Sequence, residues 1–175
     1  MGWHKKMSIT MGVVFLALGL GLAACGSSGG GMASAGSGTS TISTQNVNGV
    51  MVLTGPDGKT VYFADQEANG QIKCTGSCNT FWKPVTVTAG STPSGGSGVT
   101  GTLATVARPD GTTQVTYDGK PLYEFVKDSG SGQDSGNNFK DSFNGTNFTW
   151  HADTPAGTAA GSAPSTGGSG NNGGY

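Results

Sequence analysis

The chain has 175 residues, with nine basic and ten acidic side chains and a formal net charge of −1. Basic residues are nowhere concentrated enough to attract nucleic acid, so electrostatics excludes that class of partner. Glycine accounts for 33 residues and is spread unevenly, which separates a central domain from two polar, low-complexity segments.

Residues 1–24 have the layout of a secretory signal peptide. A basic start at Lys5 and Lys6 is followed by an almost wholly apolar run over residues 7–24 and then by Gly/Ser-rich sequence. The run is marginal for a bilayer span, which needs about 20 residues. It ends in Leu22-Ala23-Ala24-Cys25, which resembles a bacterial lipobox. The alternative is an ordinary secretory signal with an incidental cysteine.

The lipobox resemblance implies that Cys25 is lipidated after cleavage and that the protein is a membrane-anchored lipoprotein carrying acyl chains such as palmitate. Each buried CH₂ contributes about 0.8 kcal/mol, so two or three chains hold a small domain at a membrane almost irreversibly. Loss of Lys5 and Lys6 leaves seven basic against ten acidic side chains, a net charge of −3. The expected location is the cell envelope outside the cytoplasm. In a cell with two membranes it is the outer one, because Gly26 stands where a retention aspartate would be.

Two segments flank a single predicted domain. Residues 25–44 and 154–175 are rich in Gly, Ser, Ala, Thr and Asn. Such sequences cannot bury enough apolar surface to offset their ordering entropy, so we expect a flexible tether and a flexible tail. Residues 45–153 remain as one small domain of about 110 residues.

The domain consists of short β-type runs separated by turn residues. A hairpin is predicted at Val50–Leu53 and Thr60–Phe63, joined by Gly55-Pro56-Asp57-Gly58. Further strands are expected at 103–107, 114–117, 122–125 and, with Phe143 before it, 148–151. No stretch of ten or more residues shows a helical apolar stripe, so the predicted class is mainly β.

The domain contains two related halves. Asp57-Gly58-Lys59-Thr60-Val61-Tyr62 aligns with Asp118-Gly119-Lys120-Pro121-Leu122-Tyr123. Each unit continues with an aromatic residue and an acid, and each closes on a tryptophan; the residues are Phe63, Asp65 and Trp82, then Phe125, Asp128 and Trp150. We therefore predict a duplicated β-sheet domain of two hairpin-based repeats, at about 47–87 and 102–153, that bury their apolar faces against each other.

Cys74 and Cys78 remain as a pair outside the cytoplasm, where a disulfide is the default. The closed loop is short, so the chain-entropy model assigns the bridge about 2 kcal/mol. The alternative is a redox role, but no histidine or close basic pair lies beside the cysteines to lower a thiol pKa. Covalent haem is disfavoured because Asn79, not histidine, follows Cys78.

Three motifs together resemble one family. Tyr123-Glu124-Phe125-Val126-Lys127-Asp128 fits a Y-x-aromatic-x-x-D signature, Cys74–Pro84 fits a cysteine–tryptophan element, and Phe148-Thr149-Trp150-His151 is a typical ending. These are features of predicted bacterial lipoproteins known as the secreted repeat of unknown function, and the resemblance covers about Val50–His151. In the first unit Asp65 follows Tyr62 by three residues rather than five. The resemblance implies an envelope location and repeats, and names no activity.

Metal and cofactor sites are not expected. Type-1 copper needs two histidines and a thiolate, and structural zinc four nitrogen or sulfur ligands, whereas His151 is the one histidine after the signal peptide. The Asp128–Asn138 loop offers oxygen ligands for calcium, but without EF-hand spacing or its bidentate glutamate, so we interpret it as a connection. No Gly-x-Ser-x-Gly elbow is present.

Our leading interpretation is a non-enzymatic binding or structural module. Aromatic faces stack on sugars, so the candidate ligand-binding residues are Tyr62, Asp65, Tyr123, Asp128, Trp82 and Trp150, and the candidate partners are a cell-wall polymer or another envelope protein. The first alternative is a thiol–disulfide or electron-transfer protein using Cys74 and Cys78. The second is a hydrolase using acids brought together across the repeat, drawn from Asp128, Asp134, Asp141 and Asp153.

Overall fold

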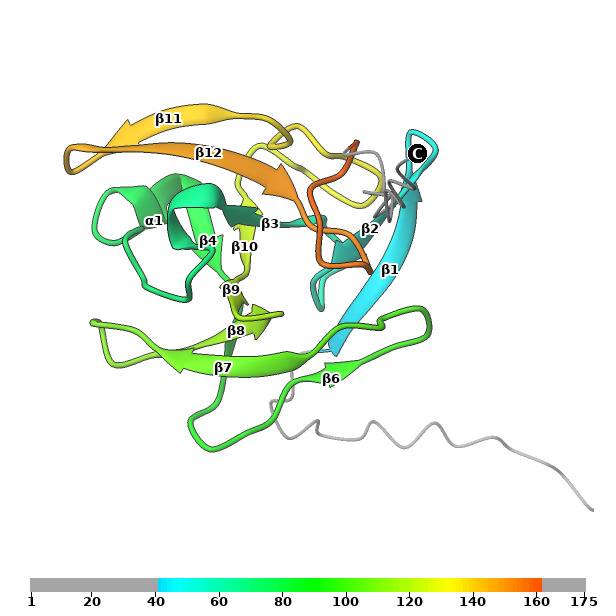
Figure 1. Cartoon of the computed structure of the whole chain (residues 1–175), viewed down its shortest axis with the longest axis horizontal. Helices are drawn as coiled ribbons and strands as arrows, with labels where there is room; N and C mark the ends of the chain where they lie inside the picture. The colour runs from blue at the N-terminus through cyan, green and yellow to red at the C-terminus, as the bar shows by residue number, and fades with distance from the viewer. Residues whose placement is uncertain (1–40, 162–175) are drawn as a thin grey trace, which may run out of the picture. The chain divides into compact units, whose positions relative to one another are not determined.

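A computed structural model describes residues 41–161 (Figure 1). The predicted signal peptide and Cys25 lie outside the described residues, as does most of each predicted flanking segment. Within 41–161, no helix is long and apolar enough to cross a membrane. The prediction of a mainly β fold is confirmed.

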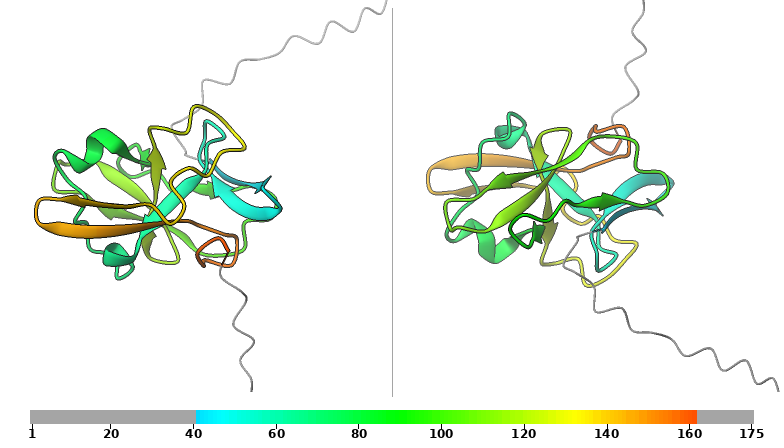
Figure 2. Two further views of the ribbon diagram at one scale, coloured as in Figure 1. Left: turned by 90° about the horizontal axis from the view of Figure 1, so that it is seen from above. Right: turned by 90° about the horizontal axis from the view of Figure 1, so that it is seen from below.

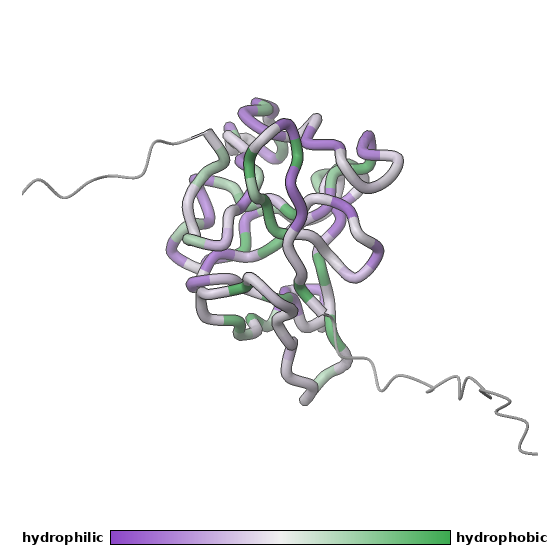
Figure 3. Tube along the Cα trace, turned by 90° about the vertical axis from the view of Figure 1, so that its right-hand side faces the viewer, coloured by the Kyte–Doolittle hydropathy of each residue, from purple (hydrophilic) through white to green (hydrophobic). Residues whose placement is uncertain are grey.

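Twelve strands and two short helices make up the described region. The strands are β1 Thr41–Val47, β2 Val50–Thr54, β3 Val61–Ala64, β4 Trp82–Pro84, β5 Thr86–Val87, β6 Ser94–Gly95, β7 Leu103–Ala107, β8 Thr113–Tyr117, β9 Lys120–Pro121, β10 Tyr123–Phe125, β11 Lys140–Phe143 and β12 Thr146–Ala152. A 3₁₀ helix, η1, spans Asp65–Glu67, and α1 spans Cys78–Phe81. Along the chain, hydrophobic and hydrophilic residues alternate in short stretches (Figure 3).

β1 and β2 form a hairpin whose turn is Asn48-Gly49, with φ angles of 51° and 88°. Asn-Gly suits this turn because both central residues need positive φ. β1 also pairs in parallel with β6, which gives a three-stranded sheet in the order β2-β1-β6. β1 begins at Thr41, inside the segment that was predicted to be a flexible tether. Ile42 is fully buried and holds this end of the strand against the core.

The central sheet has the order β11-β12-β3-β10-β4, and every pairing in it is antiparallel. β3 and β10 lie side by side at its middle, with Tyr62 directly opposite Tyr123. The β11–β12 hairpin covers the edge beyond β3 (Figures 1 and 2). Its turn is again Asn-Gly, at Asn144-Gly145, with φ angles of 51° and 77°.

The strand register relates the two halves by an approximate twofold axis between β3 and β10. On one side Trp150 of β12 is opposite Ala64, two residues after Tyr62. On the other side Trp82 of β4 is opposite Phe125, two residues after Tyr123. The tyrosines and tryptophans that align in the sequence therefore occupy corresponding places in one continuous sheet.

A third sheet has the order β5-β8-β7, and β9 also pairs with β8. Two clusters of buried side chains result. One contains the aromatic residues of the central sheet and the two cysteines. The other lies against the third sheet and includes Ile42, Leu53, Val115 and Leu122.

Residues 153–161 pack back onto the domain. The Ala160 amide donates to the Ala152 carbonyl over 2.8 Å, and Ala160 is buried. The Tyr117 hydroxyl donates to the Pro155 carbonyl over 2.6 Å. The folded domain thus extends past Asp153, the last residue of the predicted domain, because small residues can pack closely in a tight turn.

Candidate functional site

The two central tyrosines bring together most of the residues that the sequence singled out. Tyr62 and Tyr123 are both fully buried. The Tyr62 hydroxyl donates to Asp128 Oδ2 over 2.5 Å, and Asp128 belongs to the other half of the domain. The Ser135 amide donates to Asp128 Oδ1 over 3.1 Å, so both oxygens of this buried carboxylate have donors. Burial, and then the Asp128 carboxylate, raise the pKa of Tyr62 far above its usual value, so its phenol stays protonated.

Tyr123 faces a different acid, Glu67 of η1, which belongs to the first half. Burial and then the Glu67 charge raise the pKa of Tyr123 well above its usual value. Glu67 is fully buried, and its Oε1 accepts from the amides of Lys73 and Cys74 over 2.5 Å each. Glu67 follows Tyr62 by five residues, as Asp128 follows Tyr123. Each tyrosine is therefore matched with the acid of the opposite half.

Sequence reasoning chose Asp65 as the acid of the first unit and missed Glu67. Asp65 is largely exposed, and its Oδ2 lies 3.2 Å from His151 Nε2. The five-residue spacing of the second unit was the signal that could have identified Glu67. This signal was obscured because the first unit has glutamate in place of aspartate. It also has Ala64 in place of the aromatic residue that stands two positions after the tyrosine in the second unit.

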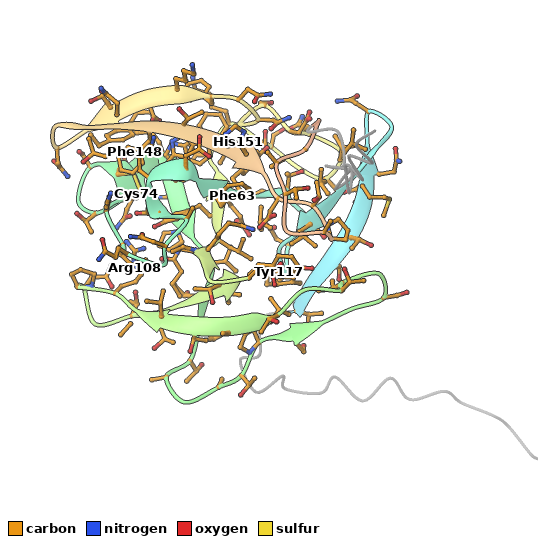
Figure 4. All side chains as sticks on the ribbon, in the orientation of Figure 1. Phe63, Cys74, Arg108, Tyr117, Phe148 and His151 are labelled. Atoms are coloured by element: carbon orange, nitrogen blue, oxygen red, sulfur yellow. A yellow bond between two sulfur atoms is a disulfide. The ribbon has the colours of Figure 1, made fainter. Side chains whose placement is uncertain are left out.

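Arg108 is a second central residue that the sequence did not indicate. Its side chain is fully buried and lies over the Tyr123 ring. The guanidinium donates to the Tyr123 hydroxyl over 3.3 Å, to the Cys74 carbonyl over 2.8 Å and to Asn79 Oδ1 over 3.0 Å. It also donates to the Gln114 side chain. Arg108 thus joins the third sheet to the disulfide loop, a contact that no local pattern could indicate (Figure 4).

Trp82 and Trp150 stack on each other with ring centroids 3.9 Å apart and planes inclined by 11°. Each is fully buried and packs edge-on against the tyrosine of its own half, at 5.5 Å for Tyr62–Trp82 and 5.2 Å for Tyr123–Trp150. Both indole N–H groups donate to one carboxylate, Asp141, over 2.7 and 2.9 Å. The aromatic faces are therefore occupied by one another and leave no surface for a sugar ring.

Cys74 and Cys78 form a disulfide, with their Cα atoms 5.3 Å apart. Both residues are fully buried. The bridge closes a turn that leads into α1, and Arg108 binds the carbonyl of its first cysteine. Thiol–disulfide exchange needs access for an attacking thiolate, so this burial favours a structural role.

The acids considered for hydrolysis have separate partners. Asp128 binds Tyr62, Asp141 binds the two indoles, and Asp134 accepts from the Asn48 amide group over 3.1 Å. Asp153 lies beside Lys120. Within residues 41–161, no group of three or more His, Cys, Asp or Glu side chains is placed to hold a metal ion.

Of the six residues predicted to bind a ligand, five lie inside the protein and one, Asp65, lies at the surface. The model of a family described as "secreted repeat of unknown function" matches residues 104–152, which run from β7 to β12. No curated protein and no solved structure matches the chain. Over residues 104–152 the chain is therefore similar to the secreted repeat of unknown function, the family that its tyrosine motif indicated.

Proposed function

We propose that this chain is a cell-envelope lipoprotein anchored through Cys25, whose β domain is a non-enzymatic binding or structural module. The family description supports a place outside the cytoplasm. The lipobox-like Leu22-Ala23-Ala24-Cys25 supports the lipid anchor, which would lie in the outer membrane of a cell that has two.

The observation that carries the non-enzymatic part is the burial of the domain's reactive groups. Tyr62, Tyr123, Trp82, Trp150 and Asp128 expose 1% of their surface or less. A catalytic group or a sugar-stacking ring has to reach its substrate, whereas the polar atoms of these residues are directed at one another. Their chemistry is used to hold the two halves together.

Any partner must therefore be recognised by the outer surface. The candidates are the membrane to which the lipid attaches and a cell-wall polymer or envelope protein beside it. A module of this kind has no turnover, so its activity is measured as binding or as envelope integrity. The redox alternative is weakened by the burial of both cysteines.

Cell fractionation with the Cys25→Ala variant tests the anchor. We expect the wild-type protein in the membrane fraction, released by detergent but not by salt, and the variant in the soluble fraction outside the cytoplasm or as an uncleaved precursor. The Cys74→Ala/Cys78→Ala variant is the matched control and should stay with the membrane. A wild-type protein that is soluble without detergent, with an unmodified Cys25 by mass spectrometry, would contradict the proposal.

A further inference from the structure

Lys120 and Asp153 lie side by side in the interior, in a contact that the proposed function does not use. Lys120 lies in β9, and Asp153 directly follows β12. Their side chains expose 9% and 0% of their surface, and Nζ lies 3.4 Å from Oδ2. A lysine and an aspartate are almost never buried unless they are paired.

Two aromatic rings lie beside the Lys120 amino group. Lys120 Nζ lies 4.7 Å from the centre of the Phe63 ring and 5.9 Å from that of Tyr117. Figure 4 shows Phe63 and Tyr117 in the middle of the molecule, between β12 and β7. Lys120 Nζ also donates to the Gly157 carbonyl over 2.7 Å, which fixes the amino group beside the carboxyl.

The carboxyl group of Asp153 differs from an ordinary ion-pair partner in its pKa and in its hydrogen bonds. Burial raises its pKa to about 7, although the charge of Lys120 acts in the opposite direction. A large share of the group is therefore uncharged near neutral pH. The Thr154 amide donates to Oδ1 over 3.0 Å, whereas Oδ2 accepts no hydrogen bond from the described residues and lies 3.4 Å from Lys120 Nζ.

A third group, the Asp118 carboxylate, lies at the entrance to this pair. A Cβ atom on Gly157 would lie 2.2 Å from Asp118 Oδ2 and 3.5 Å from Lys120 Nζ, so both groups border the same small space. Gly157 has a φ of 71° and no side chain, which keeps this space open. Asp118 is exposed to solvent.

We propose that Lys120 and Asp153 condense into an intramolecular amide bond between Nζ and Cγ. After Nζ has passed a proton to the Asp153 carboxylate within the pair, the amine attacks Cγ of the carboxyl group, and the Thr154 N–H stabilises the charge that develops on Oδ1. Asp118 accepts a proton from the attacking nitrogen and passes it to the Oδ2 hydroxyl, which leaves as water. One N–C bond forms, one C–O bond breaks and one water is released, so no oxidant, reductant or cofactor is needed.

The proximity of the two groups favours the reaction, because holding two reacting groups side by side makes the step effectively unimolecular. The bond would join β9 to the residue after β12 and close a covalent loop over residues 120–153. This inference is independent of the proposed function and concerns only how the domain is fastened.

Peptide mapping by tandem mass spectrometry of the full-length protein, purified from its own cells, tests the proposal. After denaturation, reduction and alkylation, trypsin cuts behind Lys127 and Lys140. The expected product is a branched species in which the peptide ending at Lys127 is linked to the one beginning at Asp141. Its mass should equal the sum of the two minus one water, with fragment ions assigning the link to Lys120 and Asp153.

The Lys120→Arg variant is the matched control, since arginine keeps the charge but does not form this amide. It should give the two peptides unlinked. Asp118→Asn should leave the link incomplete in freshly made protein, while Asp65→Asn, a surface acid elsewhere, should leave it complete. Two separate peptides with unmodified Lys120 and Asp153 from folded wild-type protein, verified by near-ultraviolet circular dichroism, would overturn the proposal and leave an ordinary ion pair.

Discussion

Trp82 and Trp150, 68 positions apart in the sequence, stack face to face and share the carboxylate of Asp141 as their hydrogen-bond acceptor. Each tryptophan closes one half of the domain, so this contact is the point at which the halves meet. The hydrogen bonds of this contact depend on one residue, Asp141, from the β11–β12 hairpin.

Removal of the Asp141 carboxylate should therefore destabilise the whole domain. In Asp141→Ala both indole N–H groups lose their acceptor, and we expect a loss of about 3 kcal/mol in the free energy of unfolding. Urea denaturation, monitored by tryptophan fluorescence, measures this loss in the free energy of unfolding. Asp141→Asn keeps one acceptor oxygen and should lose roughly half as much. A loss below about 0.5 kcal/mol in the alanine variant would contradict this role.

The cross-pairing of Tyr62 with Asp128 should appear as an energetic coupling. In a double-mutant cycle, Tyr62→Phe and Asp128→Asn should show a coupling of about 1–2 kcal/mol in the free energy of unfolding, because they share a buried hydrogen bond. The same cycle with Asp65→Asn is the control. Asp65 does not contact the Tyr62 hydroxyl, so its coupling should lie within the error of about 0.5 kcal/mol. Equal coupling to both acids would rule out the pairing.

Stability should increase as the pH falls from 8 to 5. Burial, and then the Asp57 charge, raise the pKa of Glu124 to about 7 in the folded protein, above the ordinary glutamate value of 4.5. Between these values the folded state binds more protons than the unfolded state, so the free energy of unfolding decreases as the pH rises. Urea midpoints at several pH values measure this, and Glu124→Gln should make the profile less steep, with Asp153 supplying the remaining slope because its pKa is raised as well. An unchanged profile would show that another group is responsible.

The buried disulfide should resist mild reductant while the protein is folded. Both sulfur atoms belong to fully buried residues, so alkylation of Cys74 and Cys78 should need denaturant as well as reductant. Cys74→Ala/Cys78→Ala should lose about 2 kcal/mol of stability, the value for a short closed loop. Rapid reduction of the disulfide in the folded protein, together with little loss of stability in the double variant, would support the redox alternative instead.

Local patterns predicted the elements that local physics determines. The Pro109-Asp110-Gly111 turn indicated the β7–β8 hairpin, which the structure confirms. The hairpin predicted at Val50–Leu53 and Thr60–Phe63 is wrong: the two segments meet at the Thr54–Thr60 bridge, and β2 and β3 then join different sheets because β1 pairs with β2. The aligned tyrosines of the two halves proved to be opposite each other in the sheet. β1 was missed because Ile42 is an isolated apolar residue among polar ones, and its burial depends on distant strands.

The interior polar contacts could not be predicted in the same way. Asp141 and Trp82 are 59 residues apart, and Arg108 and Cys74 are 34 apart, so only the assembled fold brings them together. The four aromatic candidates for ligand binding, Tyr62, Tyr123, Trp82 and Trp150, are fully buried in the core. Which acid each tyrosine meets depends on the twofold arrangement, and the alignment of the halves gives no direct sign of it.

The exchange of acids between the halves has a consequence for protein engineering. Each half on its own would expose an unfilled position in its polar core, because the acid that completes its tyrosine is carried by the other half. A chain cut between β5 and β7 should therefore yield two fragments that are insoluble or unfolded alone and restore the native spectrum when mixed. Such mutual dependence makes the domain a natural split reporter, in which reassembly signals that two fused proteins have met.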